Sequence, residues 1–224
     1  MPGTKRSNNM KNNNIKAVLF DFDGTIMDTN EVIINSWQHT FRNLTGKEAD
    51  VNMLLGTFGE PLEISIDKML PEFSRDDAMR IYREYQYCNF KGLISLFPGV
   101  VEVLRELKEK DIKTAIVTSR LRRTTMEGIE KFDLHDFFDT VVTMEDTKKH
   151  KPDAEPAFEA LRRLDIEAEK AIMVGDSKFD IMCARNAGVK SVLVDWSVAA
   201  QAESGIENKA DFKIRSLKEL LDFV

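Results

Sequence analysis

An apolar run that ends in two aspartates and a glycine constrains the fold of this chain more than any other feature. Ala17-Val-Leu-Phe has the pattern of a strand buried on both faces, and Asp21-Phe-Asp23-Gly24-Thr25 follows it directly. Such strands are typical of parallel sheets covered by helices, which bind ligands at the carboxyl ends of their strands. There Asp21 and Asp23 point to the same side and repel each other unless a cation or a shared proton compensates. We expect a ligand site at this strand end; the alternative is an Asp-Gly turn that only ends a strand.

Polar side chains end two later apolar runs in the same way. Thr118 follows one run and Asp176 another, so both are expected to share one crevice with Asp21. Asp23 and Asp180 lie close to these positions in the sequence. Four carboxylates in one crevice require a hard cation, and Mg²⁺ prefers oxygen ligands. The alternative for Asp180 is a carboxylate favoured by a helix N-terminus, and the alternative for Thr118 is a cap of the next helix.

The rest of the chain divides into a helical block and an alternating part. From Asn30 to Phe90 apolar residues recur at helical spacing, Gly46 stops the first helix, and Ser74 is a candidate N-cap of the last one. From Pro98 onward helices alternate with short apolar strands, which implies parallel βαβ units with right-handed crossovers. After the first helix, which Gly46 stops, the expected helices cover residues 62–70, 76–89, 99–110, 155–164, 178–187 and 217–223, with one more between the strands at 113–118 and 140–143. The other expected later strands cover residues 171–175, 190–195 and 211–214.

Composition narrows the class of protein. A chain of 224 residues with 42% hydrophobic residues and a net charge of −6 is typical of a folded, soluble protein, and its acidity argues against nucleic acid or an anionic membrane surface as a partner. No apolar run approaches the roughly 20 residues that span a bilayer. Cys88 and Cys183 match no metal or redox spacing, so we expect buried, inert thiols and a cytoplasmic protein. Residues 1–14 are polar, and we expect a disordered N-terminal segment.

The order and spacing of four short motifs resemble those of the haloacid dehalogenase-like (HAD) hydrolases. The motifs are Asp21-Phe-Asp23-Gly24-Thr25, Ala115-Ile-Val-Thr118-Ser119, Lys151-Pro152, and Ile172-Met-Val-Gly175-Asp176-Ser177 with Asp180 four residues on. The resemblance spans residues 15 to about 195. It implies a Rossmann-like parallel sheet as a core domain, formed by residues 15–28 and 95–224, with an all-helical cap domain inserted at residues 29–94.

The resemblance also implies the chemistry. Asp21 would be the nucleophile that forms an aspartyl-phosphate, and Asp23 would be the general acid and base. Side chains of Asp21 and Asp176 and the main-chain carbonyl of Asp23 would ligate Mg²⁺, with Asp180 ligating directly or through water. Lys151 would neutralise charge on the phosphoryl oxygens and on the nucleophile.

Further substrate contacts are expected around these motifs. By the same resemblance, Thr118 and the Ser119 region would hydrogen-bond a phosphoryl oxygen, and Gly24 and Thr25 would shape the turn beside the phosphate. Arg120 and two arginines shortly after it are candidates to hold an anionic leaving group; a plain surface role is the alternative.

The segment Gly56-Thr57-Phe-Gly59-Glu60-Pro61 in the helical block resembles the glycine-rich specificity loop of one branch of the family. That branch contains the phosphoglycolate phosphatases and a bacterial pyrophosphatase close to them. Flexible glycines would let the loop enter the active site on closure and bring Gly56, Thr57 and Glu60 to the substrate. An ordinary turn between two helices is the alternative.

These observations together predict a Mg²⁺-dependent phosphatase, monomeric or homodimeric, that acts on a small phosphorylated metabolite. Pyrophosphate is the first candidate substrate and phosphoglycolate the second. A phosphomutase similar to β-phosphoglucomutase would share the nucleophile, the acid/base and the cap; Thr25 favours a phosphatase. A non-catalytic regulatory member of the family is disfavoured because all the expected catalytic residues are present.

Overall fold

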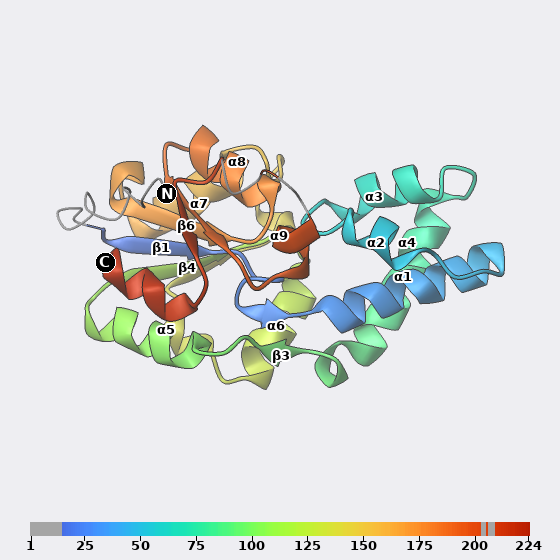
Figure 1. The fold of residues 1–224 in the computed structure, drawn as a ribbon, viewed down its shortest axis with the longest axis horizontal. Helices are drawn as coiled ribbons and strands as arrows, with labels where there is room; N and C mark the ends of the chain where they lie inside the picture. The colour runs from blue at the N-terminus through green and yellow to red at the C-terminus, as the bar shows by residue number, and fades with distance from the viewer. Residues whose placement is uncertain (1–14, 203–204, 206–208) are drawn as a thin grey trace, which may run out of the picture.

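A six-stranded parallel sheet runs through the molecule (Figure 1). The computed structural model describes residues 15–202, 205 and 209–224, so the predicted disorder of residues 1–14 lies outside the described residues. The strand order is β5-β4-β1-β6-β7-β8, and all neighbouring strands are parallel, which confirms the predicted α/β fold. The strands are β1 (Ala17–Phe20), β4 (Lys113–Val117), β5 (Thr140–Val142), β6 (Ala171–Gly175), β7 (Lys190–Val194) and β8 (Phe212–Ile214).

The first strand, β1, lies inside the sheet. After β1 the chain adds β4 and β5 on one side of it, and then crosses over to add β6, β7 and β8 on the other side. β1 pairs with β4 along one edge and with β6 along the other. In open parallel sheets a ligand binds at the carboxyl ends of the strands, at the point where the strand order reverses in this way. Asp21 directly follows β1 at that point.

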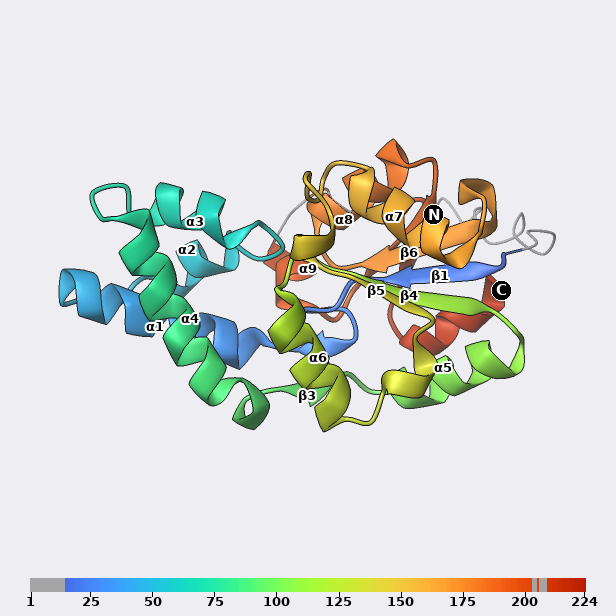
Figure 2. The ribbon, with the colours of Figure 1, turned by 180° about the vertical axis from the view of Figure 1, so that it is seen from behind.

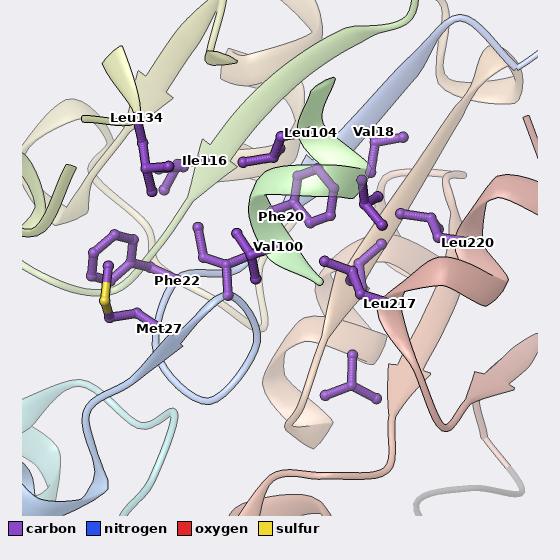
Figure 3. Close-up of a cluster of buried hydrophobic side chains, with 14 of the residues drawn as sticks. Val18, Phe20, Phe22, Met27, Val100, Leu104, Ile116, Leu134, Leu217 and Leu220 are labelled. Atoms are coloured by element: carbon purple, nitrogen blue, oxygen red, sulfur yellow. The ribbon is translucent and has the colours of Figure 1, made fainter. Parts of the chain in front are cut away.

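Alternate side chains of β1 pack on opposite faces of the sheet. Val18 and Phe20 belong to one hydrophobic cluster, and Ala17 and Leu19 belong to another. All four are fully buried, as the unbroken apolar run predicts. The first cluster is covered by α5 (Val100–Glu109), α6 (Arg122–Lys131) and the 3-10 helix η6 (Leu217–Asp222). Figure 3 shows side chains of α5 and η6 packed against Val18 and Phe20. The second cluster is covered by α7 (Glu155–Leu164) and α8 (Lys178–Asn186), seen in Figures 1 and 2.

The four helices between residues 30 and 89 form a separate group beside the sheet (Figures 1 and 2). We call them the helical insertion: α1 (Asn30–Thr45), α2 (Val51–Leu55), α3 (Leu62–Met69) and α4 (Arg75–Asn89). The insertion has its own hydrophobic cluster, in which Trp37 and Tyr82 meet edge to face with ring centroids 5.2 Å apart. Gly46 ends α1 in the left-handed conformation, and the Ser74 side chain caps α4, both as predicted.

Several short elements differ from the expectations. β2 (Met27–Asp28) and β3 (Ser95–Leu96) pair antiparallel where the chain enters and leaves the helical insertion. The sequence patterns do not predict this pair, nor α2 and α9 (Val198–Ala202), and the expected helix near the C-terminus is a 3-10 helix. Elements of two to five residues are too short to show either alternation or a helical period.

Two expectations from composition can be compared with the structure. Cys183 is buried, and burial raises the pKa of its thiol to about 12. Cys88 is exposed, so the expectation of a buried thiol is wrong there; it lies off the buried face of α4, which carries Met79, Tyr82 and Gln86. Among the residues that the structure describes, no helix combines the length and the apolar character needed to cross a membrane.

Asp146 ties α7 to the segment that follows β5. Its carboxylate accepts hydrogen bonds from Arg163 of α7 (2.8 Å) and from the main-chain N–H and the hydroxyl of Thr143 (2.7 Å each), and it also pairs with Arg122. Burial alone raises the pKa of Asp146, but these partners outweigh burial and hold the pKa well below its ordinary value of 3.8. A carboxylate with a lowered pKa stabilises the fold above its unfolded-state pKa, and this stabilisation is lost as the pH falls.

We expect Asp146→Asn to lower the free energy of unfolding near neutral pH by about 1–3 kcal/mol, because the buried Thr143 and the partly buried Arg163 lose a charged acceptor. The difference from wild type should shrink below the unfolded-state value of 3.8, where unfolding begins to take up a proton. Urea titrations at about pH 7 and about pH 3 measure both quantities. Glu127→Gln, which removes a surface pair with Arg123, is the control and should change stability little. An equal difference at both pH values would contradict the prediction.

Candidate active site

A tight turn places two aspartates directly beyond β1. The N–H of Met27 donates to the carbonyl of Phe22 (3.0 Å), and the N–H of Gly24 donates to the carbonyl of Met27 (2.9 Å). Gly24 has a φ of +73°, and a Cβ at this position would lie 2.0 Å from Oδ2 of Asp176. The turn therefore requires glycine both for its conformation and for the close approach of the Asp176 carboxylate.

Lys151 is buried between two carboxylates. Its Nζ lies 2.6 Å from Oδ1 of Asp21 and 2.6 Å from Oδ1 of Asp180, and it also donates to the carbonyl of Val117 at the end of β4 (3.2 Å). Only 3% of the Lys151 side chain is exposed. Burial acts to lower the pKa of Lys151, but Asp180 and Asp21 outweigh burial and raise it, so the group stays a charged ammonium.

Three carboxylates converge beside this ammonium. Asp21, Asp176 and Asp180 each offer an oxygen, and these oxygens lie within 4.8 Å of one another. Burial, together with the charges of Asp180 and Asp23, raises the pKa of Asp21 to about 7 against the opposing effect of Lys151. Burial, Asp21 and Asp180 also raise the pKa of Asp176 well above its ordinary value. The ammonium of Lys151 alone therefore does not balance the negative charge of these three carboxylates, and an all-oxygen donor set of this kind fits Mg²⁺.

Asp180 is both the carboxylate at the start of α8 and a partner of Lys151. Its Oδ2 accepts hydrogen bonds from the N–H (3.0 Å) and the hydroxyl (2.6 Å) of Ser177, which completes a capping box. Its Oδ1 accepts from Lys151. Both oxygens are therefore engaged by protein donors.

Asp23 is paired with Arg120 and not with Lys151. Nε of Arg120 lies 2.9 Å from Oδ2 of Asp23 and Nη2 lies 2.7 Å from Oδ1, while the Thr29 hydroxyl donates to Oδ1 (2.6 Å). The Arg120 guanidinium is buried and lies 4.7 Å from the centroid of the Phe90 ring. Its Nη1 has no hydrogen-bond partner among the described residues. Buried donors without partners are rare, so this one indicates a place for a ligand.

Thr118 and Ser119 form the turn after β4. The Thr118 hydroxyl accepts a hydrogen bond from the N–H of Arg120 (3.1 Å), so it stabilises the turn, and Thr118 also lines the cavity described below. The Ser119 hydroxyl is buried and has no partner among the described residues. Thr25 is fully buried, with its hydroxyl 3.5 Å from Oδ2 of Asp21, and is not a lining residue.

A cavity of about 120 Å³ lies between the strand ends and the helical insertion. A cavity of roughly 150 Å³ accommodates a guest of the size of benzene, so this one suits a small metabolite. From the strand ends the lining includes Asp21, Asp23, Gly24, Thr118, Ser119, Arg120, Lys151 and Asp176, and from the insertion and its loops it includes Asn30, Trp37, Thr57, Gly59, Glu60, Tyr82, Arg83 and Gln86.

The loop between α2 and α3 reaches the core at Gly59. This residue has a φ of +78°, and a Cβ there would lie 2.7 Å from the Ser177 hydroxyl oxygen and 2.8 Å from the Ser177 Cβ. Thr57 and Glu60 line the cavity, whereas Gly56 ends α2 and does not. Because Gly59 lies against the residue that follows Asp176, the loop closes one side of the cavity.

Some residues predicted to bind substrate have partners elsewhere. Glu60 accepts a hydrogen bond from Ser65 (2.9 Å) and is ion-paired with the lysine at the end of α3, so its charge is compensated within the insertion. Arg122 and Arg123 pair with acidic residues outside the cavity, and neither lines it.

Sequence reasoning missed the contribution of α4. Tyr82, Arg83 and Gln86 of this helix line the cavity. Positions three or four apart share one face of a helix, but the same spacing describes any core-facing helix. The sequence therefore held no signal that this face meets the strand ends.

Comparisons with known proteins agree with this geometry. A sequence model of the haloacid dehalogenase-like hydrolases matches residues 18–194, and the chain belongs to this family. It is 41% identical over 213 residues to "Putative pyrophosphatase PpaX" of Caldanaerobacter subterraneus subsp. tengcongensis, covering 94% of each chain. It is 35% identical over 210 residues to pyrophosphatase PpaX of Halalkalibacterium halodurans, covering 94% of this chain and 97% of the relative. The solved structure of a haloacid dehalogenase-like family hydrolase from Streptococcus pneumoniae superposes with a TM-score of 0.83 at 29% identity, covering 94% of this chain and 98% of that one.

We expect Gly59→Ala to lower kcat/KM for the phosphorylated substrate by about tenfold or more, because the added Cβ forces the loop away from Ser177 and enlarges the cavity. Gly46→Ala is the matched control: Gly46 has a φ of +73°, but a Cβ there meets no atom within 4 Å. Both variants carry a similar conformational strain, so they should lose similar stability in thermal unfolding. Equal losses of activity in both variants would show that the contact at Gly59 is not needed.

Proposed function

We propose that this protein is a Mg²⁺-dependent phosphatase that acts on a small phosphorylated metabolite through an aspartyl-phosphate, with pyrophosphate as the favoured substrate. One observation carries the proposal: the buried Asp21 carboxylate lies 2.6 Å from the Lys151 ammonium, within a group of carboxylates that fits a divalent cation. The two relatives named pyrophosphatase PpaX, which align with this chain over at least 94% of each protein, support the choice of pyrophosphate over phosphoglycolate.

Asp21 would act as the nucleophile. One of its carboxylate oxygens forms a bond to phosphorus while the bond from phosphorus to the leaving oxygen breaks. Lys151 lies against the same carboxylate and is protonated, so it holds Asp21 in place and offsets the negative charge of the incoming phosphoryl group. Because both side chains are almost fully buried, this compensation acts in a low dielectric, where it is strongest.

Asp21 and Asp176 would hold Mg²⁺ through side-chain oxygens, and Asp23 through its main-chain carbonyl. Both oxygens of Asp180 already accept hydrogen bonds, which favours an indirect contribution through water or Lys151. When bound, Mg²⁺ supplies positive charge that reduces the repulsion between phosphate and carboxylate and stabilises the transition state.

Asp23 would protonate the leaving oxygen and later take a proton from the water that hydrolyses the aspartyl-phosphate. Arg120 and Thr29 occupy both oxygens of Asp23 in the structure. Catalysis therefore requires the carboxyl group to turn from Arg120 toward the leaving oxygen.

The experiment that tests the function is phosphate release from a panel of pyrophosphate, phosphoglycolate, sugar phosphates and nucleotides, with Mg²⁺ and after chelation. We expect release that depends on Mg²⁺ and is fastest with pyrophosphate. Conversion of β-glucose 1-phosphate to glucose 6-phosphate without phosphate release would instead identify a phosphomutase. Absence of both activities would overturn the proposal.

Asp21→Asn should abolish turnover, because an amide oxygen is a poor nucleophile, while the thermal unfolding profile stays cooperative. Beryllium fluoride with Mg²⁺ should form a stable analogue of the aspartyl-phosphate on the wild type and not on the variant, as ¹⁹F NMR would show. Asp50→Asn, which keeps a good N-cap at α2, is the control and should retain activity. Appreciable turnover by Asp21→Asn would exclude the nucleophilic role.

Asp23→Asn should lose most of its activity on alkyl phosphates and less on an activated aryl phosphate such as p-nitrophenyl phosphate. Protonation matters most when the leaving oxygen is strongly basic, and general acid–base catalysis contributes about 10²–10⁴-fold. The ratio of kcat/KM between the two substrate types is the quantity to measure. Losses of the same size on both types would mean that Asp23 is not the acid.

A further inference from the structure

Helix α4 brings an arginine without a protein partner into the cavity. Arg83 is half-buried and lines the cavity, and within the described residues its guanidinium has no hydrogen-bond or ion-pair partner. Gln86 lies one turn further along, is 9% exposed, also lines the cavity, and its side-chain amide forms no hydrogen bond with a described residue. Residues three apart share one face of a helix, so α4 presents a guanidinium and an amide together.

The charges at the strand ends do not need Arg83. Four carboxylates gather there, those of Asp21, Asp23, Asp176 and Asp180, and the cations that contact them among the described residues are Lys151 and Arg120. With all six groups ionised, two negative charges remain, which is the charge that one Mg²⁺ balances. The remaining acidic lining residue, Glu60, is paired within the insertion. The positive charge of Arg83 is therefore left for a ligand.

The direction of phosphoryl transfer places the leaving group on the side of the insertion. The attacking and leaving oxygens lie roughly in line through phosphorus. With Asp21 at the end of β1 as the attacking group, the leaving group extends away from the sheet, toward the wall formed by Tyr82, Arg83 and Gln86. The unpaired Nη1 of the buried Arg120 is a further donor at the same cavity.

We propose that Arg83, together with Gln86 and Nη1 of Arg120, binds a negative charge on the leaving group. The substrates are then small phosphates whose leaving group is itself an anion, a phosphate or a carboxylate. This inference rests on the proposed phosphatase function and adds the residue that selects among substrates. Because Arg83 belongs to the helical insertion and Arg120 to the segment after β4, one anion would contact both parts of the cavity wall at once.

A pair of substrates isolates the leaving-group charge. Phosphoglycolate and 2-hydroxyethyl phosphate have nearly the same size and the same alkyl phosphate ester, but only phosphoglycolate carries a carboxylate. The wild type should hydrolyse phosphoglycolate with a kcat/KM about 10- to 100-fold higher, the range expected for hydrogen bonds to a charged group. Pyrophosphate extends the comparison to an inorganic leaving group.

Arg83→Gln tests the residue itself. It should lower kcat/KM for phosphoglycolate and pyrophosphate by about 10- to 100-fold and change that for 2-hydroxyethyl phosphate by less than about threefold. Arg83→Lys keeps the charge and should recover part of the loss. Arg80→Gln is the matched control, because Arg80 lies on the same helix with 56% of its side chain exposed and pairs only with Asp77 and Glu84 among the described residues; it should leave all three rates unchanged.

The outcomes separate this inference from the function on which it rests. If the wild type hydrolyses none of the substrates of the panel, the proposed function fails. If it hydrolyses the neutral and the anionic substrate equally well, or if Arg83→Gln lowers both rates by the same factor, the phosphatase function stands and the role of Arg83 is overturned. Thermal unfolding of each variant shows whether a uniform loss arises from a damaged fold.

Discussion

The buried ammonium of Lys151 is the interaction on which the candidate active site depends. It joins Asp21 and Asp180, which lie 130 and 29 positions away in the chain, and it also binds the carbonyl at the end of β4. A buried ion pair adds little net stability, because each charge gives up its hydration. Its presence is better explained by the chemistry, since Lys151 opposes the rise in the pKa of Asp21 that burial causes. Without it, two carboxylates would be left in the interior without compensation.

The parallel sheet makes this arrangement possible. β4, β1 and β6 are neighbours, and their carboxyl ends deliver Thr118, Asp21 and Asp176 to one place. β1 and β6 carry no polar side chain, and β4 is apolar and buried from Ala115 to Val117, so the polar side chains of the site begin where these strands stop. Gly24 then allows the Asp176 carboxylate to approach the turn after β1 more closely than any side chain would permit.

The helical insertion completes the cavity with groups of a different kind. The strand ends supply the carboxylates and the ammonium that would act on phosphorus, and these have partners or fit a cation. The insertion supplies the loop at Gly59 and the face of α4 that carries Arg83 and Gln86. Chemistry common to all substrates would therefore reside at the strand ends, and selection among leaving groups in the insertion. Arg120 stands between the two, because it pairs with Asp23 and packs on Phe90 just beyond α4.

Local patterns in the sequence were sufficient to predict the parallel α/β fold, most of its strands and longer helices, and the carboxylates at the strand ends. Burial, periodicity and capping are properties of neighbouring residues, so a strand such as β1 and a cap such as Ser74 can be recognised without knowledge of the rest of the molecule. The two-residue strands β2 and β3 could not be recognised, because their pairing depends on a partner far away in the chain.

The tertiary structure alone decided which charged groups face each other. Asp23 and Arg120 are 97 positions apart, and no spacing in the sequence indicates that they pair. Glu60, predicted to meet the substrate, lines the cavity with its charge paired inside the insertion, whereas Arg83, which resembles any surface arginine in the sequence, lines the cavity without a described partner. The physical reason is that the energy of a charge depends on its distance to other charges and on its burial, and both are set only when distant segments pack together.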